Sequence, residues 1–445
     1  MNRTSNEPKE GIPNEGLPRN PVIRFHFRFP IFDFFFQWLL GAQTHGGSET
    51  GEAFYVASKI RNADAESWIQ EWQALARRVE ARAETSFKQA HYVSAREAYL
   101  RAYTYNRAPL AFMSPYRDSL RYQSCYRKAQ ACFRQAVALL NPPGEIIEIP
   151  FEGRNLPGYF FTPDASPTRR KTLIMIGGAD TFVEDLYAYI GPAALKRSYN
   201  LLIVDLPGQG NLPFAGLVWR TDAEAPMKAV VDYALSRPEV DPERLAAYGI
   251  SAGGYLVPRA ASYEKRLKAC VVCSAILDFS GIWPSRTRNI ENSRLYKFIM
   301  ALPLRSVKTR LALFDTYEWR WGAHSMRELY ELCTKMTVDP RLITCPFLNL
   351  IAEQEYTRFG MSREWAGKCM AEVANPEKKV IVTPANEGAD SHSAGTNLSL
   401  VSELVFDWLD ELFRTGPDRL IATVGGEESD YFTVDMHTGQ SPRQN

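Results

Sequence analysis

The chain of 445 residues has no block of basic residues, because its 52 lysines and arginines are balanced by 51 aspartates and glutamates. A net charge of +1 offers little attraction to a phosphate backbone, so nucleic acid is not expected as a partner. The chain also lacks an apolar run of about 20 residues, which a transmembrane helix needs. Residues 29–42 are strongly apolar, but the segment is shorter and contains Asp33 and Gln37. We expect a helix of the core or of a dimer interface there, with contact to a membrane surface as the alternative.

Cysteine is sparse and has no framework spacing. The seven cysteines lie at positions 125, 132, 270, 273, 333, 345 and 369. An odd, scattered set is typical of a reducing compartment, and we expect a cytoplasmic protein. Cys270 and Cys273 have the C-x-x-C spacing, but no second pair and no histidine lies near them. Core packing therefore explains these two residues better than zinc or redox chemistry.

The glycine-rich fingerprints of nucleotide binding are also missing. No G-x-G-x-x-G pattern opens a helix after the first expected strand. Residues 206–210 (LPGQG) are rich in glycine, but they lack the Lys-Ser/Thr end of a phosphate loop. The sequence therefore predicts neither a cofactor nor a metal centre.

The chain divides into regions that differ in the spacing of their apolar residues. Residues 50–141 have apolar side chains at helical spacing, whereas apolar runs alternate with helical patterns from residue 145 onward. Such alternation is typical of an α/β protein with a mostly parallel sheet flanked by helices. Helical patterns over 296–314 and 325–336 interrupt the alternation. The predicted organisation is a flexible lead over 1–28, a helical cap or dimerisation domain over 29–141, a first core part over 142–280, a helical lid insertion over 281–340, a second core part over 341–415 and a flexible tail over 416–445. We expect the lid insertion to cover the carboxyl edge of the sheet, where doubly wound folds bind ligands, and so to line the pocket.

One pentapeptide carries most of the functional signal. Residues 249–253 (GISAG) match the G-x-S-x-G pattern, between an apolar strand over 244–250 and a stretch of small residues over 251–261. In this context the serine stands on a strained strand-to-helix turn that exposes its hydroxyl as a nucleophile. Ser251 is therefore the candidate nucleophile, with a plain strand-to-helix turn as the alternative.

A serine hydroxyl needs a base to take its proton and an acid to orient that base. In the α/β-hydrolase arrangement the acid and then the histidine follow the serine along the chain. Of the six histidines, His392 lies in the loop between the last expected strand, 378–383, and the last expected helix, 397–413. This is the place of the base, so His392 is the candidate.

The acid is expected after the strand that precedes this last one. That strand ends at Ala352, and Glu355 lies three positions beyond it. Glu353 is the nearest rival, Asp390 is close to the histidine in sequence, and a solvated acidic turn is the plain alternative. The sequence favours Glu355 for the acid.

Two backbone N–H groups are needed to stabilise the oxyanion of the tetrahedral intermediate. The amide of Ala252, directly after the serine, is the first candidate. The second is Ala179, in the GGAD loop that follows the expected strand over 171–176. The two glycines before Ala179 allow a close approach of the backbone, although a paired glycine also fits a plain turn.

Several segments together resemble a known group: residues 177–185 (GGADTFVED), 205–210 (DLPGQG), 249–255 (GISAGGY) and 389–392 (ADSH), followed by 406–409 (FDWL). They are similar to segments of the α/β-hydrolases with an N-terminal helical domain, typified by 2,6-dihydropseudooxynicotine hydrolase. Within this group the chain resembles fungal biosynthetic hydrolases of the fusarin and cytochalasan type, which are linked to polyketide–nonribosomal-peptide metabolites.

The resemblance implies Ser251 as nucleophile, Glu355 in the acid position and His392 as base, commonly in a homodimer. It also implies an additional acid, for which Asp278 is the nearest candidate. The expected function is serine hydrolysis of an ester, lactone, thioester, amide or activated ketone in a large apolar metabolite of fungal secondary metabolism. A non-hydrolytic cyclase or a carbon–carbon bond hydrolase on the same fold is the alternative. A non-enzymatic receptor or scaffold with this fold is a third interpretation.

Overall fold

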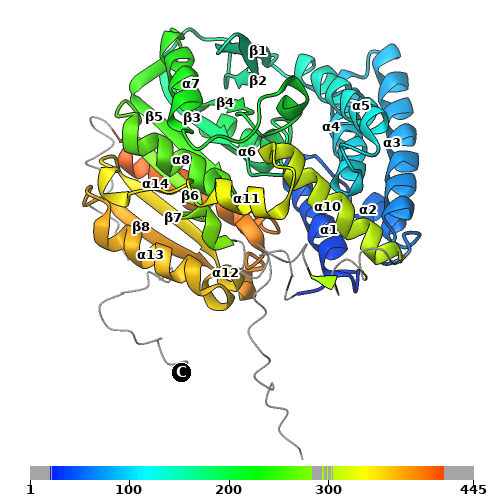
Figure 1. The fold of residues 1–445 in the computed structure, drawn as a ribbon. Helices are drawn as coiled ribbons and strands as arrows, with labels where there is room; N and C mark the ends of the chain where they lie inside the picture. Colours follow the sequence, from blue (N-terminus) through cyan, green and yellow to red (C-terminus); the bar gives the residue numbers. More distant parts are fainter. Residues whose placement is uncertain are drawn as a thin grey trace, which may run out of the picture.

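An eight-stranded sheet forms the centre of the larger part of the molecule (Figure 1). The computed structural model describes residues 21–414, except 22, 283–292, 295–297, 299–301 and 303. The strand order is β1-β2-β4-β3-β5-β6-β7-β8, and β2 pairs antiparallel with both of its neighbours while the other pairs are parallel. The strands are β1 Glu145–Phe151, β2 Arg154–Phe161, β3 Arg170–Ile176, β4 Asn200–Val204, β5 Val240–Ile250, β6 Ala269–Cys273, β7 Phe347–Ala352 and β8 Lys378–Thr383. This sheet confirms the predicted mostly parallel architecture.

Helices cover both faces of the sheet because its central strands are apolar on both sides. Alternate side chains of β3 and β4 enter two different apolar clusters, as the two-residue period of a strand requires. One cluster includes α6 and α14, and the other includes α7, α8 and α13. The helices of the core are α6 Asp185–Lys196, α7 Glu224–Ser236, α8 Gly253–Tyr263, α12 Glu353–Arg358, α13 Gly360–Glu372 and α14 Leu398–Leu412. The carboxyl ends of the parallel strands are left for the loops that carry the site.

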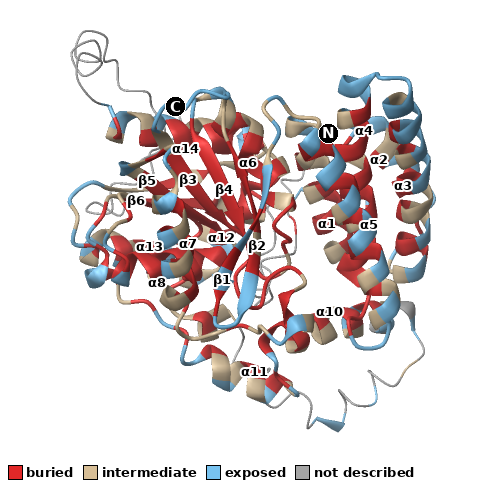
Figure 2. Ribbon diagram, turned by 90° about the horizontal axis from the view of Figure 1, so that it is seen from above, coloured by how far each residue is buried: buried red, intermediate tan, exposed pale blue. Residues whose placement is uncertain are grey.

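In the part of the chain that the structure describes, five α-helices precede the sheet and lie beside it (Figures 1 and 2). They are α1 Pro30–Gly41, α2 Thr50–Ala57, α3 Ala65–Lys88, α4 Tyr92–Arg107 and α5 Ser119–Ala138. Helix α4 packs against both α3 and α5. Phe133 of α5 meets Tyr159 of β2 edge to face, with 5.0 Å between ring centroids. The helical region is therefore joined to the core through a shared apolar cluster.

The apolar segment around residues 29–42 folds as α1 and is buried within the chain. Its Asp33 is fully buried, and its carboxylate accepts hydrogen bonds from the backbone N–H groups of Phe25, His26 and Phe27 at 2.8–3.0 Å. Gln37, one turn later, also donates to this carboxylate. These backbone N–H groups satisfy the buried carboxyl group and tie residues 25–27, at the end of the predicted lead, to α1.

The insertion between β6 and β7 contains α10 Arg305–Trp321 and α11 Met326–Cys333. Helix α10 continues past residue 314, where the sequence predicted its end, because Trp319, Arg320 and Trp321 are all buried by neighbouring elements. Most of the predicted first turns, from 296, lie outside the described residues, as do the predicted lead up to residue 20 and the predicted tail over 416–445. Within the described part of the chain, no helix combines the length and the apolar character needed to cross a bilayer.

Candidate active site

Ser251 stands on a tight turn between β5 and α8, as the G-x-S-x-G pattern predicted. Its φ of 54° lies in the left-handed region, where the backbone of any residue other than glycine is strained. The Ser251 N–H donates to the carbonyl of Cys273 at 2.9 Å, which ties the turn to the end of the neighbouring strand β6. Gly249 is required because a Cβ at this position would lie 2.1 Å from the carbonyl oxygen of Gly253. The strained geometry and this close approach hold the hydroxyl at the carboxyl edge of the sheet.

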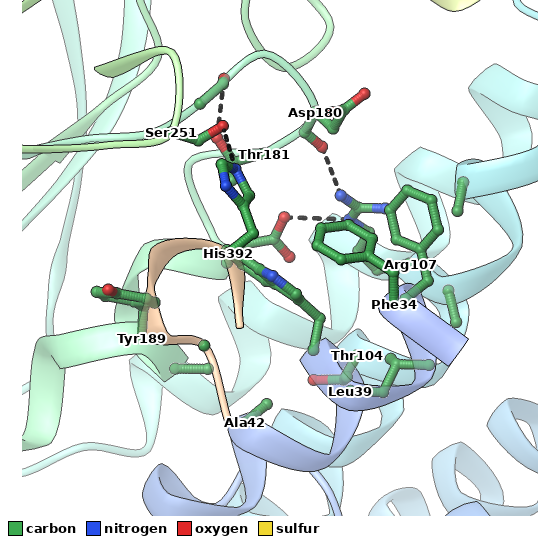
Figure 3. A pocket seen from close by; sticks show the side chains of 18 of the residues that line it. Phe34, Leu39, Ala42, Thr104, Arg107, Asp180, Thr181, Tyr189, Ser251 and His392 are labelled. Atoms are coloured by element: carbon green, nitrogen blue, oxygen red, sulfur yellow. Dashed lines mark hydrogen bonds and ion pairs between the residues drawn. The ribbon is translucent and has the colours of Figure 1, made fainter. Parts of the chain in front are cut away.

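A hydrogen-bonded chain runs from this serine through His392 and Glu355 to Ser274, and Figure 3 shows its first contact, between Ser251 and His392. His392 Nε2 lies 2.9 Å from Ser251 Oγ, and His392 Nδ1 pairs with Glu355 Oε1. The histidine and glutamate side chains are only 10% and 4% exposed. The second carboxylate oxygen of Glu355 accepts a hydrogen bond from Ser274 Oγ at 3.1 Å. Because both ends of the imidazole are bonded, its ring orientation is fixed.

The structure also places the rival acids. Glu353 points to the next loop, where its carboxylate accepts the backbone N–H of Ala385 at 2.6 Å. Asp390 is buried, and this burial raises the pKa of its carboxyl group. Glu355 is the one of the three whose carboxylate pairs with His392. Its assignment as the acid remains a prediction, but the geometry favours it over both rivals.

Asp278, the candidate additional acid, is not brought to this site. Its carboxylate accepts from the backbone N–H and the hydroxyl of Ser280, at 2.9 and 2.7 Å. Its backbone pairs with Thr337 in an isolated bridge. Asp278 is not among the residues that line the cavity around Ser251. The described contacts therefore give Asp278 a local structural role.

The two candidate oxyanion donors lie on the two backbone segments that meet at Ser251. Ala252 follows the serine directly, and Ala179 follows Gly178 in the loop after β3; both alanines are buried. A Cβ on Gly178 would lie 2.5 Å from Ser251 Cβ and 3.4 Å from the Ala252 nitrogen. Only glycine therefore permits this approach, which places the Gly178–Ala179 peptide next to the serine.

A cavity opens in front of Ser251 and His392, between the core and the N-terminal helices (Figure 3). It contains about 870 Å³ of space free of atoms, part of it open to solvent. The helical wall is largely apolar, and its members from α1, α3, α4 and the following turn are Phe34, Phe35, Trp38, Leu39, Trp68, Tyr103, Thr104, Arg107, Ala108 and Ala111. The Phe34 ring lies 5.9 Å from the His392 ring, so the helical region touches the candidate base.

One end of the cavity is polar. Arg107 of α4 donates to Asp185 at 3.1 Å and to the backbone carbonyl of Asp180 at 2.5 Å, and Tyr103 donates to Asp185 at 2.6 Å. Burial lowers the pKa of Arg107, whereas the nearby Asp185, Tyr103 and Tyr122 raise it. The net shift of this pKa is upward. A cation and an anion therefore face one end of an otherwise apolar space.

The part of the predicted lid that the structure describes does not line this cavity. None of the described residues between 281 and 340 is among the lining residues. Helix α10 instead lies behind the loops of the core wall, where Arg320 donates to the carbonyls of Gly208 and Gly210 at 3.0 and 3.4 Å. The expectation that the insertion lines the pocket is therefore wrong for its described residues, because α1 occupies that position. The described residues contain no group of three or more histidine, cysteine, aspartate or glutamate side chains that could hold a metal ion.

Some residues around the site were missed by the sequence analysis. Ser274, the partner of Glu355, belongs to no motif and gave no signal in the sequence. Gln209 was visible only as the residue between two glycines of the LPGQG segment. Phe34 lay in a segment predicted as an interior or interface helix, so its contact with His392 could not be foreseen.

Comparisons with known proteins show which family and which hydrolases the chain is similar to. The family model described as "Esterase FrsA-like" matches residues 58–304. The chain is 35% identical over 423 residues to the hydrolase ORFZ of Pyricularia oryzae, covering 87% of this chain and 97% of that one. It is 28% identical over 417 residues to the 20-hydroxy-prefusarin hydrolase FUS2 of Gibberella moniliformis, covering 88% and 99%.

Two solved structures share the fold. The structure of a 2,6-dihydroxy-pseudo-oxynicotine hydrolase superposes with a TM-score of 0.65 at 19% identity, covering 84% of this chain and 95% of that one. The structure of AbyA5 superposes with a TM-score of 0.60 at 17% identity, covering 87% and 96%. Both matches include the N-terminal helices as well as the sheet, because they extend over most of each chain.

Proposed function

Because the chain belongs to the FrsA-like esterase family and is a hydrolase with the α/β-hydrolase fold, we propose that it uses a Ser251–His392–Glu355 triad for acyl transfer to water. The observation that carries the proposal is the unbroken chain of contacts from Ser251 Oγ through both imidazole nitrogens to the Glu355 carboxylate. Family membership makes a non-enzymatic receptor or scaffold the weaker reading.

The proposed reaction has two halves. Ser251 Oγ attacks the substrate carbonyl carbon while its proton passes to His392 Nε2, and the carbonyl electron pair moves onto the oxygen. The N–H groups of Ala179 and Ala252 donate to this oxyanion. When the intermediate collapses, the bond to the leaving group breaks and His392 returns the proton to that group. Water then attacks the acyl-enzyme by the same route and releases the acid and the free serine.

Glu355 contributes by holding the imidazole in place. Its carboxylate accepts the Nδ1–H, which leaves Nε2 free to accept the serine proton, and it stabilises the imidazolium that forms. The hydrogen bond from Ser274 keeps the carboxylate in this orientation. The buried position excludes water that would compete for the same hydrogen bonds.

The substrate that fits the cavity is a large, mostly apolar metabolite with one polar end. Aromatic side chains of α1 form one wall, and Arg107 with Asp185 forms the polar end. A relative of similar length is named as a hydrolase of 20-hydroxy-prefusarin. We therefore propose an ester, lactone, thioester, amide or activated ketone of fungal secondary metabolism, of polyketide or polyketide–nonribosomal-peptide type, as substrate.

A cyclisation by an internal nucleophile of the substrate is the second candidate. The observation that favours it is the apolar Phe34 ring beside His392, with 5.9 Å between ring centroids, because an apolar neighbour disfavours a water molecule at the candidate base. Turnover in water labelled with heavy oxygen separates the two reactions. Hydrolysis puts one labelled oxygen into the acid product, whereas cyclisation leaves the product unlabelled.

The test of the nucleophile is Ser251→Ala, with Ser262→Ala as a matched control at the far end of α8. Ser262 is buried, and its hydroxyl donates to the Pro258 carbonyl within α8, so its loss should leave activity near wild type. We expect Ser251→Ala to lose fluorophosphonate labelling and about 10⁴-fold or more of its turnover of a p-nitrophenyl ester, with an unchanged circular dichroism spectrum. Labelling of Ser251→Ala at the wild-type rate would contradict the proposal.

A further inference from the structure

The side chain of Gln209 is fully buried between the loop after β4 and the loop after β3. Its Oε1 accepts the backbone N–H of Leu206 at 2.9 Å. Its Nε2 donates to the backbone carbonyls of Gly177 and Gly178, at 2.6 and 3.2 Å. The side-chain nitrogen of Gln209 therefore donates to both glycines that precede Ala179.

The Gly178 carbonyl determines where the Ala179 N–H points. The two groups belong to one trans, planar peptide unit, so they point in opposite directions. The Thr181 hydroxyl donates to the same carbonyl at 3.1 Å. With two donors on this oxygen, the peptide cannot rotate without breaking buried hydrogen bonds, which is costly.

Gln209 is itself held from behind. Arg320 of α10 is 1% exposed and donates to the carbonyls of Gly208 and Gly210, on both sides of the glutamine. The Arg320 carbonyl in turn accepts the Trp219 N–H at 2.9 Å. The insertion therefore braces the loop that carries Gln209, and this loop braces the backbone next to Ser251.

We propose that Gln209 is a positioning residue that aims the Ala179 N–H at the substrate oxygen while that oxygen becomes an oxyanion. The inference rests on the proposed function, because it presupposes acyl transfer at Ser251. Gln209 touches neither substrate nor reacting atoms. It acts through the Gly178–Ala179 peptide, which a Cβ-free Gly178 brings against the serine.

The test is Gln209→Met in the full chain, assayed with p-nitrophenyl butyrate. Met keeps the length and the volume but cannot donate to the carbonyls of Gly177 and Gly178. We expect kcat to fall by about a hundredfold, with KM within about twofold, because the oxyanion exists only in the transition state. A trifluoromethyl ketone, whose adduct with a serine is an oxyanion, should bind more weakly by a similar factor.

The matched control is Asn200→Leu, which removes an equally buried amide at the opposite end of the sheet. Asn200 donates to Thr172 and to the Glu239 carbonyl, so its loss lowers stability without touching the site. We expect Asn200→Leu to keep the wild-type kcat. Gln209→Asn, which retains the amide but is one methylene too short to span both loops, should lose at least about tenfold in kcat.

The outcomes separate the inference from the proposed function. Wild-type kcat in Gln209→Met, or an equal loss in Asn200→Leu, would overturn the positioning role even if Ser251→Ala is inactive. Failure of both Gln209 variants to fold would also overturn it, since the side chain would then serve the fold. Full activity of Ser251→Ala would instead remove the proposed function itself.

Discussion

The two walls of the cavity differ in the groups that line them: backbone groups of turns on the core side and apolar side chains on the helical side. The core wall consists of turns whose backbone groups surround Ser251, and its polar atoms are held by buried side chains such as Gln209 and Ser274. The helical wall consists mainly of aromatic and aliphatic side chains from α1, α3, α4 and the following turn, which pack by shape. Catalysis depends on the direction of hydrogen bonds, so the core wall tolerates little change. Recognition of an apolar substrate depends on volume, which many side chains can supply.

The two walls meet at two neighbouring carboxylates at the start of α6. Asp185 accepts from Tyr103 and Arg107 of α4. Glu184 is fully buried and accepts from Tyr126 and Gln130 of α5, and from Tyr159 of β2. The helical region is thus fixed to the core by directed polar contacts as well as by the apolar cluster. The shape of the cavity therefore depends on both parts of the chain.

The largest effect should come from the acid of the core wall. We expect Glu355→Gln to lower kcat by about 10³-fold or more, because the amide can present its N–H to Nδ1 and thereby select the wrong imidazole tautomer. The matched variant Glu353→Gln removes a charge two residues away, at a carboxylate that contacts only the next loop, and should stay within about threefold of wild type. Steady-state kinetics of both variants decides the matter. A large loss in Glu353→Gln with activity retained in Glu355→Gln would reverse the assignment.

A moderate effect should come from the helical wall. Phe35 lines the cavity beside Phe34, and Phe35→Leu enlarges the space without removing a hydrogen bond. We expect KM for p-nitrophenyl esters with long acyl chains to change by up to about tenfold, with kcat within about twofold. A series of acyl chain lengths measures this effect. If kcat fell as far as in Glu355→Gln, the helical wall would take part in catalysis as well as in substrate recognition, and the distinction between the two walls would be wrong.

The smallest effect concerns the junction between the walls. Burial raises the pKa of Glu184, so the folded state binds its proton more tightly than the unfolded state does. Its contribution to stability is complete below the unfolded pKa of about 4.3 and is lost as the pH rises through the higher folded value. Glu184→Gln can keep the three hydrogen bonds on one oxygen but does not titrate. We expect the free energy of unfolding of the variant, relative to wild type, to increase as the pH rises.

Urea unfolding at several pH values, from below the unfolded pKa of Glu184 to above its folded pKa, measures the difference in free energy of unfolding between Glu184→Gln and wild type. Glu243→Gln is the control, because the Glu243 side chain is 77% exposed and should leave the pH dependence as in wild type. A constant difference between Glu184→Gln and wild type at all pH values would show that the buried carboxyl does not titrate differently in the folded state.

Much of the core wall could be predicted because its residues are bound to local patterns. The turn at Ser251 needs small residues on both sides, and the chain order of a hydrolase then limits the partners to a few positions after β5. His392 and Glu355 were found in this way, and the structure brings both to the serine. Counting positions after the strand favoured Glu355 over Glu353, and the structure separates the two, because side chains two residues apart in a short helix point to different loops.

The helical wall could not be predicted to the same degree. Periodicity indicated helices from residue 50 onward and an apolar segment around 29–42, but amphipathic patterns do not say which element a face meets. The sequence therefore assigned part of the pocket to the insertion, whereas α1 supplies the aromatic wall and α10 lies behind the core loops. The packing of segments far apart in the sequence decides that α1, and not the described part of the insertion, lines the pocket.

The amino-acid sequence by itself determined the fold class, the turn at Ser251 and the candidate residues of the triad. These features depend on short-range rules: strand and helix periods, the small residues that a strained turn tolerates, and the fixed chain order of one topology. Only the tertiary structure showed that α1 lines the cavity and that the buried amide of Gln209 bonds to the backbone beside the serine. Those contacts join residues far apart in sequence, and their hydrogen bonds depend on distances of a few ångströms that no local pattern encodes.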